Sequence, residues 1–239
     1  MPDRLNAYGQ PIGPDVPDWQ ARPWPPRTAM VGRFCTIDPV DPARDAADLF
    51  EAYAEAPDDR DWTYLASERP ATLETFRAHL EAIAATTDPF HHTITDIATG
   101  RPVGTAALMR IDPANGVIEI GWINSSRRLQ RTVASTEAMF LFMSRAFDEL
   151  GYRRYEWKCD SRNAPSRATA LRLGFQFEGI FRQAAVAKGR SRDTAWFSII
   201  DGEWPALREA YEAWLRPENF DAEGRQRERL ADCIARSRG

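Results

Sequence analysis

The chain has 239 residues, of which 43% are hydrophobic, and a formal net charge of -4. This content is enough for one domain with a sizeable core, and the lack of a basic excess argues against nucleic acid as a partner. The cysteines, Cys35, Cys159 and Cys233, lie far apart without metal-ligand spacing, so they predict neither disulfides nor a metal site. With neither a targeting segment nor 18 consecutive apolar residues, the sequence predicts a cytoplasmic protein that is not bound to a membrane.

The first 28 residues are rich in proline, which removes hydrogen-bond donors and opposes both helix and sheet. Trp19 and Trp24 lie within this segment, although large aromatic side chains are uncommon in free disordered arms. We therefore expect residues 1–28 to form an extended arm that packs against the body or against a second subunit. A homodimer is one expectation, with a single domain over 29–216 and a polar, mobile or interface tail over 217–239.

The first part of the domain is predicted to be a strand over 32–37 followed by two helices. Apolar residues recur at helical spacing over 46–54 and again over 71–84. The connector 58–65 combines charged residues with Trp62, which is unusual for a simple link, so it is a candidate loop on the substrate side.

The middle and the end of the domain alternate between the two-residue periodicity of strands and the roughly 3.6-residue periodicity of helices. Three strands in series are followed by a helix that Gly151 ends, then by a strand, a short helix, a closing hairpin and a last helix. The expected ranges are 90–97, 103–111, 117–123, 139–150, 154–159, 165–173, 175–187, 194–200 and 203–216. This order predicts a mixed α/β protein in which a mostly antiparallel twisted sheet is flanked by helices.

The stretch over 130–138 is a short loop that leads directly into a strong helix. A helix N-terminus exposes backbone N–H groups and the positive end of the helix dipole, and such a site binds a diphosphate without any particular side chain. Most junctions of this kind only cap the helix. The residues alone therefore leave both interpretations open.

Three segments of the sequence resemble the RimJ/RimL-like branch of the GNAT acetyltransferases. They are Gln130-Arg131-Thr132-Val133-Ala134-Ser135-Thr136-Glu137-Ala138, Asn163-Ala164-Pro165-Ser166 and Leu173-Gly174-Phe175. The resemblance covers residues 30 to 200 and implies the GNAT fold, acetyl-CoA as acetyl donor and a protein N-terminal amine as acceptor. It also implies that the donor diphosphate lies against Gln130, Arg131, Thr132, Val133, Ala134, Ser135 and Thr136.

The loop departs from the family pattern Gln/Arg-x-x-Gly-x-Gly/Ala at one position. Gln130 matches the first position and Ser135 is the small final residue, but Val133 replaces the first glycine. A β-branched residue is poorly suited to a positive φ, so either the backbone is ordinary there or diphosphate binding is weakened. Arg127, Arg128 and Arg131 could supply guanidinium groups to the phosphates or could be a solvated surface; Arg131 is the favoured contact.

The segment after the next strand has the residue types that begin a helix, with Asn163 as the expected N-cap. The resemblance implies, in addition, that Asn163 and Ser166 line the pantetheine arm and lie near the thioester sulfur. Glu137 is expected to stabilise the first turn of its helix and to take no part in catalysis.

Acetylation of an amine requires a neutral nitrogen. From reference pKa values, roughly one α-amine in ten is neutral at pH 7, but fewer than about one lysine in a thousand. Glu119, on the strand before the donor loop, is the candidate base, acting directly or through water, and a structural or substrate-binding glutamate is the alternative. Ser166 is the candidate acid for the departing thiolate, because no tyrosine occurs over 160–175. A covalent route through Cys159 is disfavoured, since GNAT transfer is usually direct.

Three other functions stay open from the sequence. A small amine, such as an aminosugar, polyamine or amino acid, could replace the protein N-terminus as the acceptor. Because Val133 and the missing tyrosine depart from the family, a GNAT-fold binding or interaction module without catalysis is a second alternative. Transfer of a longer acyl group is a third.

Overall fold

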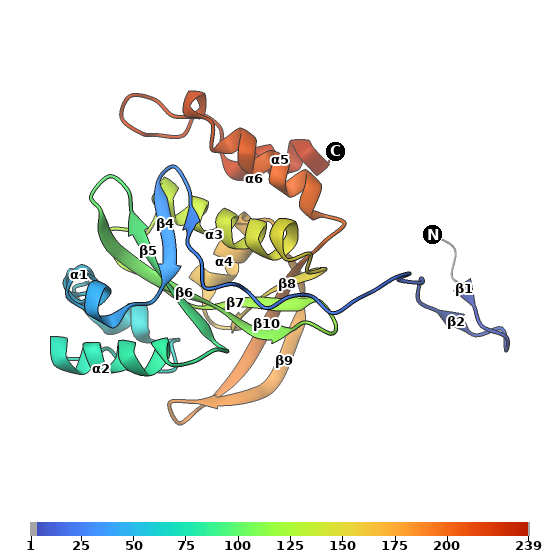
Figure 1. The fold of residues 1–239 in the computed structure, drawn as a ribbon, viewed down its shortest axis with the longest axis horizontal. Helices are drawn as coiled ribbons and strands as arrows, with labels where there is room; N and C mark the ends of the chain where they lie inside the picture. The colour runs from blue at the N-terminus through green and yellow to red at the C-terminus, as the bar shows by residue number, and fades with distance from the viewer. Residues whose placement is uncertain (1–3, 239) are drawn as a thin grey trace.

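The computed structural model describes residues 4–238 and places an eight-stranded sheet at the centre of the protein (Figure 1). The strand order is β3-β4-β5-β6-β7-β8-β10-β9. Its strands are β3 (Met30–Val31), β4 (Cys35–Pro39), β5 (Phe90–Asp96), β6 (Arg101–Asp112), β7 (Val117–Ser125), β8 (Arg154–Asp160), β9 (Gln176–Ala187) and β10 (Arg190–Ile200). Every neighbouring pair is antiparallel except β7 and β8. The predicted mixed, mostly antiparallel fold is thereby confirmed.

Helices cover both faces of the sheet. They are α1 (Pro42–Ala54), α2 (Leu73–Ala84), α3 (Val133–Ser144), α4 (Ala164–Arg172), α5 (Trp204–Trp214) and α6 (Leu230–Arg238), with short helical turns η1 (Asp59–Trp62), η2 (Arg145–Glu149) and η3 (Pro217–Asn219). Several of these helices have a polar side chain as N-cap. Asp41 caps α1, Thr72 forms a capping box with Thr75 at α2, and Thr132 caps α3.

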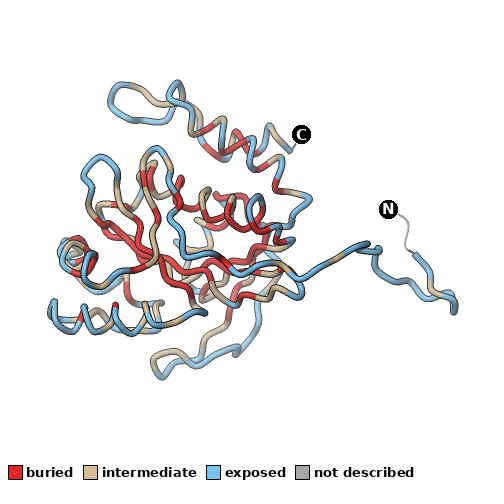
Figure 2. The backbone as a smooth tube through the Cα atoms, viewed as in Figure 1, coloured by how far each residue is buried: buried red, intermediate tan, exposed pale blue. Residues whose placement is uncertain are grey.

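The sheet separates two hydrophobic cores. The smaller core lies between α1, α2 and η1, and its buried side chains include Leu49, Tyr53, Trp62 and Phe76. The larger core lies on the other face, where α3 and α4 pack on the strands and α5 and α6 pack beyond α3 (Figures 1 and 2). Both faces of the central strands are therefore buried, which explains why β6 is an almost continuous apolar run.

Glu137 joins α3 to the turn between β3 and β4. Its carboxylate accepts hydrogen bonds from the backbone N–H groups of Arg33, Phe34 and Cys35 at 2.9, 2.6 and 2.9 Å. The side chain is 4% exposed, and a Cβ atom at Gly32 would lie 2.4 Å from one of its oxygens. Glu137 therefore fixes the turn between β3 and β4 to α3. This structural role is larger than the expected stabilisation of the first turn of its own helix.

The N-terminal arm is attached to the body along its second half. The Trp19 indole N–H donates to the carbonyl of Ala114 at 2.7 Å. Arg145 is buried and donates to Thr28 Oγ1 and to the Ala29 carbonyl at 3.0 and 3.1 Å. Farther toward the N-terminus the strands β1 (Arg4–Leu5) and β2 (Pro11–Ile12) pair with each other away from the body (Figure 1).

The C-terminal segment, expected to be a mobile or interface tail, instead contains α6. Leu230, Cys233 and Ile234 recur on one side of this helix and are buried in the larger core. Arg238 donates to the carbonyl of Gly174 at 2.8 Å. The helical spacing of these three apolar residues was not recognised in the sequence, because many charged residues surround them. No helix in the described part of the chain is long and apolar enough to cross a membrane.

Candidate active site

The two parallel strands at the centre of the sheet separate part of the way along. β7 pairs with β8 only from Val117–Arg154 to Ile120–Trp157. Beyond that point residues 121–125 pair only with β6, and residues 158–160 pair only with β10. Among the described residues, the facing edges of the two strands thus carry backbone N–H and C=O groups without a strand partner, and an extended amide-containing ligand can pair with such edges.

The N-terminus of α3 follows β7 across a seven-residue loop over 126–132. Thr132 Oγ1 accepts the Ser135 N–H at 3.1 Å and caps the helix. Within residues 4–238, the N–H groups of Val133 and Ala134 have no hydrogen-bond partner. Unsatisfied N–H groups together with the helix dipole make this turn suitable for a phosphate.

The backbone strain in this loop falls on Arg131 rather than on Val133. Arg131 has φ +61°, whereas Val133 is the first residue of α3 and is absent from the positive-φ positions of the described chain. Of the two possibilities that the departure from the family pattern left open, the structure therefore supports an ordinary backbone at Val133. A valine is compatible with this turn because a helix start binds an anion through its backbone N–H groups, which valine has like other residues.

The polar side chains of the loop divide into paired and free groups. Arg128 donates to two glutamates at the end of α1, and Arg127 lies 3.4 Å from Asp61. Gln130 Nε2 donates to the Ser125 carbonyl at 2.9 Å and is therefore engaged within the protein. Arg131 is exposed and has no carboxylate within salt-bridge distance among the described residues.

The start of α4 lies beside the unpaired end of β8. Asn163 caps α4 by accepting the Ser166 N–H at 3.1 Å. Ser166 Oγ accepts the Trp157 indole N–H at 3.0 Å, and the Ser166 hydroxyl also lies within hydrogen-bonding reach of the Cys159 side chain. Arg172, in the last turn of α4, donates to Thr136 Oγ1 at 3.2 Å and ties α4 to the first turn of α3. The structure therefore brings the two predicted donor-binding segments together.

Glu119 belongs to a network of charges on β6, β7 and β8. The side chain is 3% exposed, and Arg110 Nη1 lies 2.8 Å from both of its oxygens. Lys158 Nζ bridges Glu119 and Glu156 at 2.9 and 2.6 Å, and Arg154 binds the second carboxylate at 2.6 Å. Cations from the two neighbouring strands thus hold the Glu119 carboxylate in place. Its part as a base stays a prediction.

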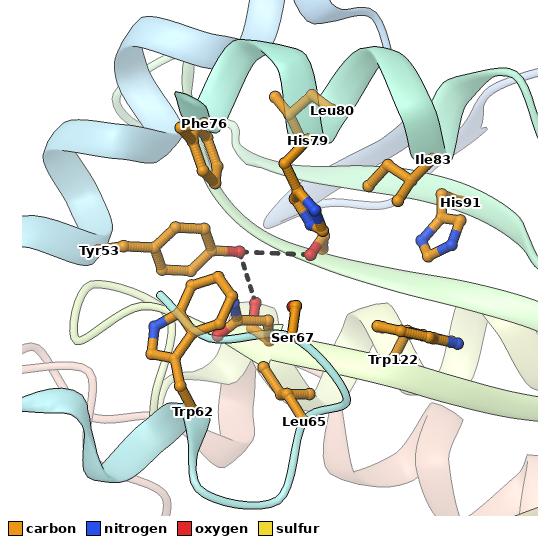
Figure 3. A pocket seen from close by; sticks show the side chains of 12 residues that line it. Tyr53, Trp62, Leu65, Ser67, Phe76, His79, Leu80, Ile83, His91 and Trp122 are labelled. Carbon is orange, nitrogen blue, oxygen red and sulfur yellow. Dashed lines mark hydrogen bonds between the residues drawn. The ribbon is translucent and has the colours of Figure 1, made fainter. Parts of the chain in front are cut away.

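A small pocket lies on the α1/α2 face of the sheet (Figure 3). β7 carries one extra residue between Gly121 and Asn124, and Trp122 at φ +50° turns its ring toward the pocket. The Tyr53 hydroxyl donates to the Asn124 carbonyl at 2.9 Å. The pocket is lined by Tyr53, Trp62, Leu65, Ser67, Phe76, His79, Leu80, Ile83, His91, Thr105, Trp122 and Asn124.

The sequence predicted only part of this pocket. Trp62 and Leu65 belong to the loop that had been expected on the substrate side. His79, His91 and Trp122 were missed, because helical spacing and strand alternation mark them only as ordinary positions. The bulge that exposes Trp122 depends on the pairing register of β6 and β7, which the sequence of one strand does not contain.

Burial makes the pocket histidines neutral at physiological pH. The pKa of His91 is lowered to about 4, chiefly by burial and further by the nearby His79. The pKa of His79 is lowered as well, by burial alone. Since none of the lining residues is a carboxylate, lysine or arginine, the pocket is electrically neutral around pH 7 and suits an uncharged group.

We expect the protein to lose stability when the pH falls from about 6.5 toward 4. In that range an unfolded histidine with a pKa of about 6.5 binds a proton, while folded His91 does not, so the unfolded state gains up to about 1.4 kcal/mol per pH unit. Urea unfolding of the protein and of the His91→Asn variant, compared between about pH 7 and pH 5, measures the effect. The variant should lose less stability on acidification; an equal loss in both proteins would contradict this origin.

Cys159 lies on β8 near the same end of the sheet. Its pKa is raised, chiefly by burial, so at neutral pH the side chain is a thiol rather than a reactive thiolate. Within residues 4–238 no group of three or more His, Cys, Asp or Glu side chains is placed to hold a metal ion.

The structure thus combines a mostly antiparallel sheet with parallel central strands that separate beside a helix N-terminus. Residues 35–176 match the family model described as an acetyltransferase (GNAT) domain. The chain belongs to the GNAT acetyltransferase family, and its sequence relatives support the RimJ/RimL-like branch.

Three relatives illustrate the match. A GCN5-related N-acetyltransferase from Brucella melitensis is 48% identical in a solved structure, with a TM-score of 0.90 over 92% of this chain and 100% of that chain. The uncharacterized N-acetyltransferase p20 of Bacillus licheniformis is 34% identical over 44% of this chain and 59% of its own length. The ribosomal-protein-serine acetyltransferase of Escherichia coli (strain K12) is 31% identical over 42% of this chain and 56% of its own. The chain thus spans less than two thirds of either curated relative.

Proposed function

We propose that the protein is an acetyl-CoA-dependent N-acetyltransferase whose acceptor is a protein N-terminal α-amine. The observation that carries the proposal is the separation of β7 and β8 beside the free N–H groups at the start of α3. The ribosomal-protein-serine acetyltransferase of Escherichia coli supports the choice of a protein acceptor.

In the proposed donor complex, the amides of the pantetheine arm pair with the unpaired edges over 121–125 and 158–160. The diphosphate accepts hydrogen bonds from the N–H groups at the start of α3. Arg131, which forms no ion pair with a carboxylate of the described chain, adds a positive charge. Asn163 and Ser166, at the start of α4, line the thioester. The remaining donor contacts are those expected from the sequence: Gln130, Thr132, Val133, Ala134, Ser135 and Thr136.

The proposed acceptor site is the neutral pocket beside Trp122. An α-amine enters it partly deprotonated, since roughly one in ten is neutral at pH 7, and its nitrogen attacks the thioester carbonyl carbon. The C–N bond forms as the C–S bond breaks. Glu119 receives the amine proton through water, and Ser166 passes a proton from water to the thiolate, so that its own hydroxyl is restored. Because a thiol has a pKa of about 8.5, near neutrality, water can supply that proton.

The Glu119→Gln variant tests the base. If Glu119 accepts the proton, kcat falls by roughly 100-fold or more while the acetyl-CoA dissociation constant is retained. The matched control is Glu156→Gln, which removes a carboxylate from the same ion-pair network without removing the proposed base. Undiminished turnover in Glu119→Gln, or an equal loss in both variants, would assign Glu119 to the sheet rather than to the chemistry.

The acceptor is tested with purified protein, acetyl-CoA and peptides that begin with serine, alanine or methionine. Thiol release measures turnover, and mass spectrometry locates the acetyl group. We expect acetylation of the peptides with a free α-amine. We expect no acetylation of matching peptides that have a blocked N-terminus and an internal lysine. Turnover with only a polyamine or an aminosugar would identify a small-molecule enzyme; acetyl-CoA binding without turnover of any amine would identify a binding module.

A further inference from the structure

The tip of the β9–β10 hairpin holds the loop that carries Trp62. Lys188 Nζ donates to the Trp62 carbonyl at 2.8 Å and lies 2.9 Å from Glu68 Oε2. Arg190 Nη2 donates to the Thr63 carbonyl at 3.3 Å. Lys188 and Gly189 form a two-residue turn with φ +50° and +70°, the tight geometry of a hairpin, and this turn fixes the direction in which the lysine leaves the strand.

The contact with the Trp62 carbonyl is the better protected of the two that Lys188 makes. The side chain of Lys188 is 12% exposed, whereas that of Glu68 is 76% exposed. Water therefore weakens the ion pair far more than the hydrogen bond to the backbone. Lys158 and Lys188 are the only lysines of the sequence, and both place their ammonium groups at enclosed positions where one compact charge meets two acceptors.

Trp62 connects the hairpin tip to the pocket, because its carbonyl binds Lys188 and its side chain lines the pocket. Its ring packs edge-on against Tyr53, with centroids 5.8 Å apart and an interplanar angle of 80°. The Tyr53 hydroxyl is bound in turn to the Asn124 carbonyl on the part of β7 that is free of β8 (Figure 3). The free space in the pocket is about 20 Å³, little more than one water molecule occupies, so a small shift of Trp62 changes which groups fit.

We propose that Lys188 is a positioning residue that sets the width of the acceptor pocket by holding the Trp62 carbonyl, and that it thereby selects acceptors with a small, uncharged first side chain. This inference rests on the proposed function. It places the selectivity for the acceptor on a hairpin that is remote in sequence from both the pocket helices and the donor loop.

The test compares Lys188→Met, Lys188→Arg and the control Arg182→Met in steady-state assays with peptides that differ only in a first residue of serine or phenylalanine. Arg182 is an exposed cation on β9 of the same hairpin. For Lys188→Met we expect the KM of the serine peptide to rise roughly tenfold, with kcat and the acetyl-CoA dissociation constant within about twofold. The preference for serine over phenylalanine should shrink. Lys188→Arg should recover part of both, and Arg182→Met should match the unmodified protein.

The outcomes separate this inference from the proposed function. If the unmodified protein acetylates no peptide, the proposed function fails before Lys188 is tested. If it acetylates peptides and Lys188→Met changes neither the acceptor KM nor the serine preference, the positioning role is wrong. An equal change in Arg182→Met, or a weakened affinity for acetyl-CoA in Lys188→Met, would also overturn it, because either result indicates a general disturbance of the fold.

Discussion

The Glu137→Ala variant is expected to lose about 3 to 5 kcal/mol of unfolding free energy, the largest effect of any single substitution considered for this chain. One carboxylate accepts the N–H groups of Arg33, Phe34 and Cys35, and its removal leaves three donors without their acceptor in an enclosed turn. For a chain of this size the loss corresponds to roughly 10 °C or more in the unfolding temperature. Urea unfolding followed by circular dichroism gives the free energy.

Two further variants identify the cause. Glu74 lies exposed in the first turn of α2, and its change to alanine should stay within about 0.5 kcal/mol of the unmodified protein. Gly32→Ala should be destabilising on its own, since the added Cβ would lie 2.4 Å from the Glu137 carboxylate. A Glu137→Ala protein as stable as the Glu74→Ala control would show that the turn does not depend on this side chain.

The Arg131→Glu variant is expected to bind acetyl-CoA roughly 10- to 100-fold more weakly, with its fold unchanged. The substitution reverses a charge near the proposed diphosphate, and each pair of unit charges a few ångströms apart contributes about 1 kcal/mol in water. Arg131 is exposed and makes no ion pair within the described chain, so its replacement removes no internal contact. Isothermal titration with acetyl-CoA measures the change, which should diminish as salt is raised.

Arg127→Glu is the matched control for this charge reversal. Arg127 lies in the same loop and is also exposed, but it pairs with Asp61. We expect a much smaller effect on acetyl-CoA affinity. Equal weakening in both variants would mean that the loop acts only through its overall charge, and undiminished affinity in Arg131→Glu would remove Arg131 from the donor site.

Most of the fold was predictable because its elements carry clear periodic patterns and strong stop signals. The three meander strands and the closing hairpin appear within a few residues of their expected ranges, whereas α3 begins six residues before the range that its periodicity predicted. The helix α6 was missed, because it has only three buried residues among many charged ones. The attachment of the arm through Arg145 could not be predicted either, since a buried arginine looks like a surface residue until its partners are known.

The segments proposed to bind the donor were easier to recognise in the sequence than the residues of the proposed acceptor pocket, for a physical reason. A helix N-terminus and its cap are local features, so Asn163 could be assigned as the cap of α4 from neighbouring residues. The pocket depends on a one-residue bulge in β7 and on contacts between segments far apart in the chain, such as Lys188 with Trp62. The ion pairs of Glu119 likewise come from three strands, and they change how that carboxylate has to be tested.

The most direct test of the account is thermal unfolding of the purified protein with saturating acetyl-CoA, with CoA and ATP as controls. At about one hundred times the dissociation constant, a ligand of the folded state adds about 2.7 kcal/mol, or roughly 5 to 10 °C for a chain of this size. We predict an increase of that size with acetyl-CoA and CoA and none with ATP. An unfolding temperature that saturating acetyl-CoA leaves unchanged would contradict a donor site between β7, β8 and the start of α3.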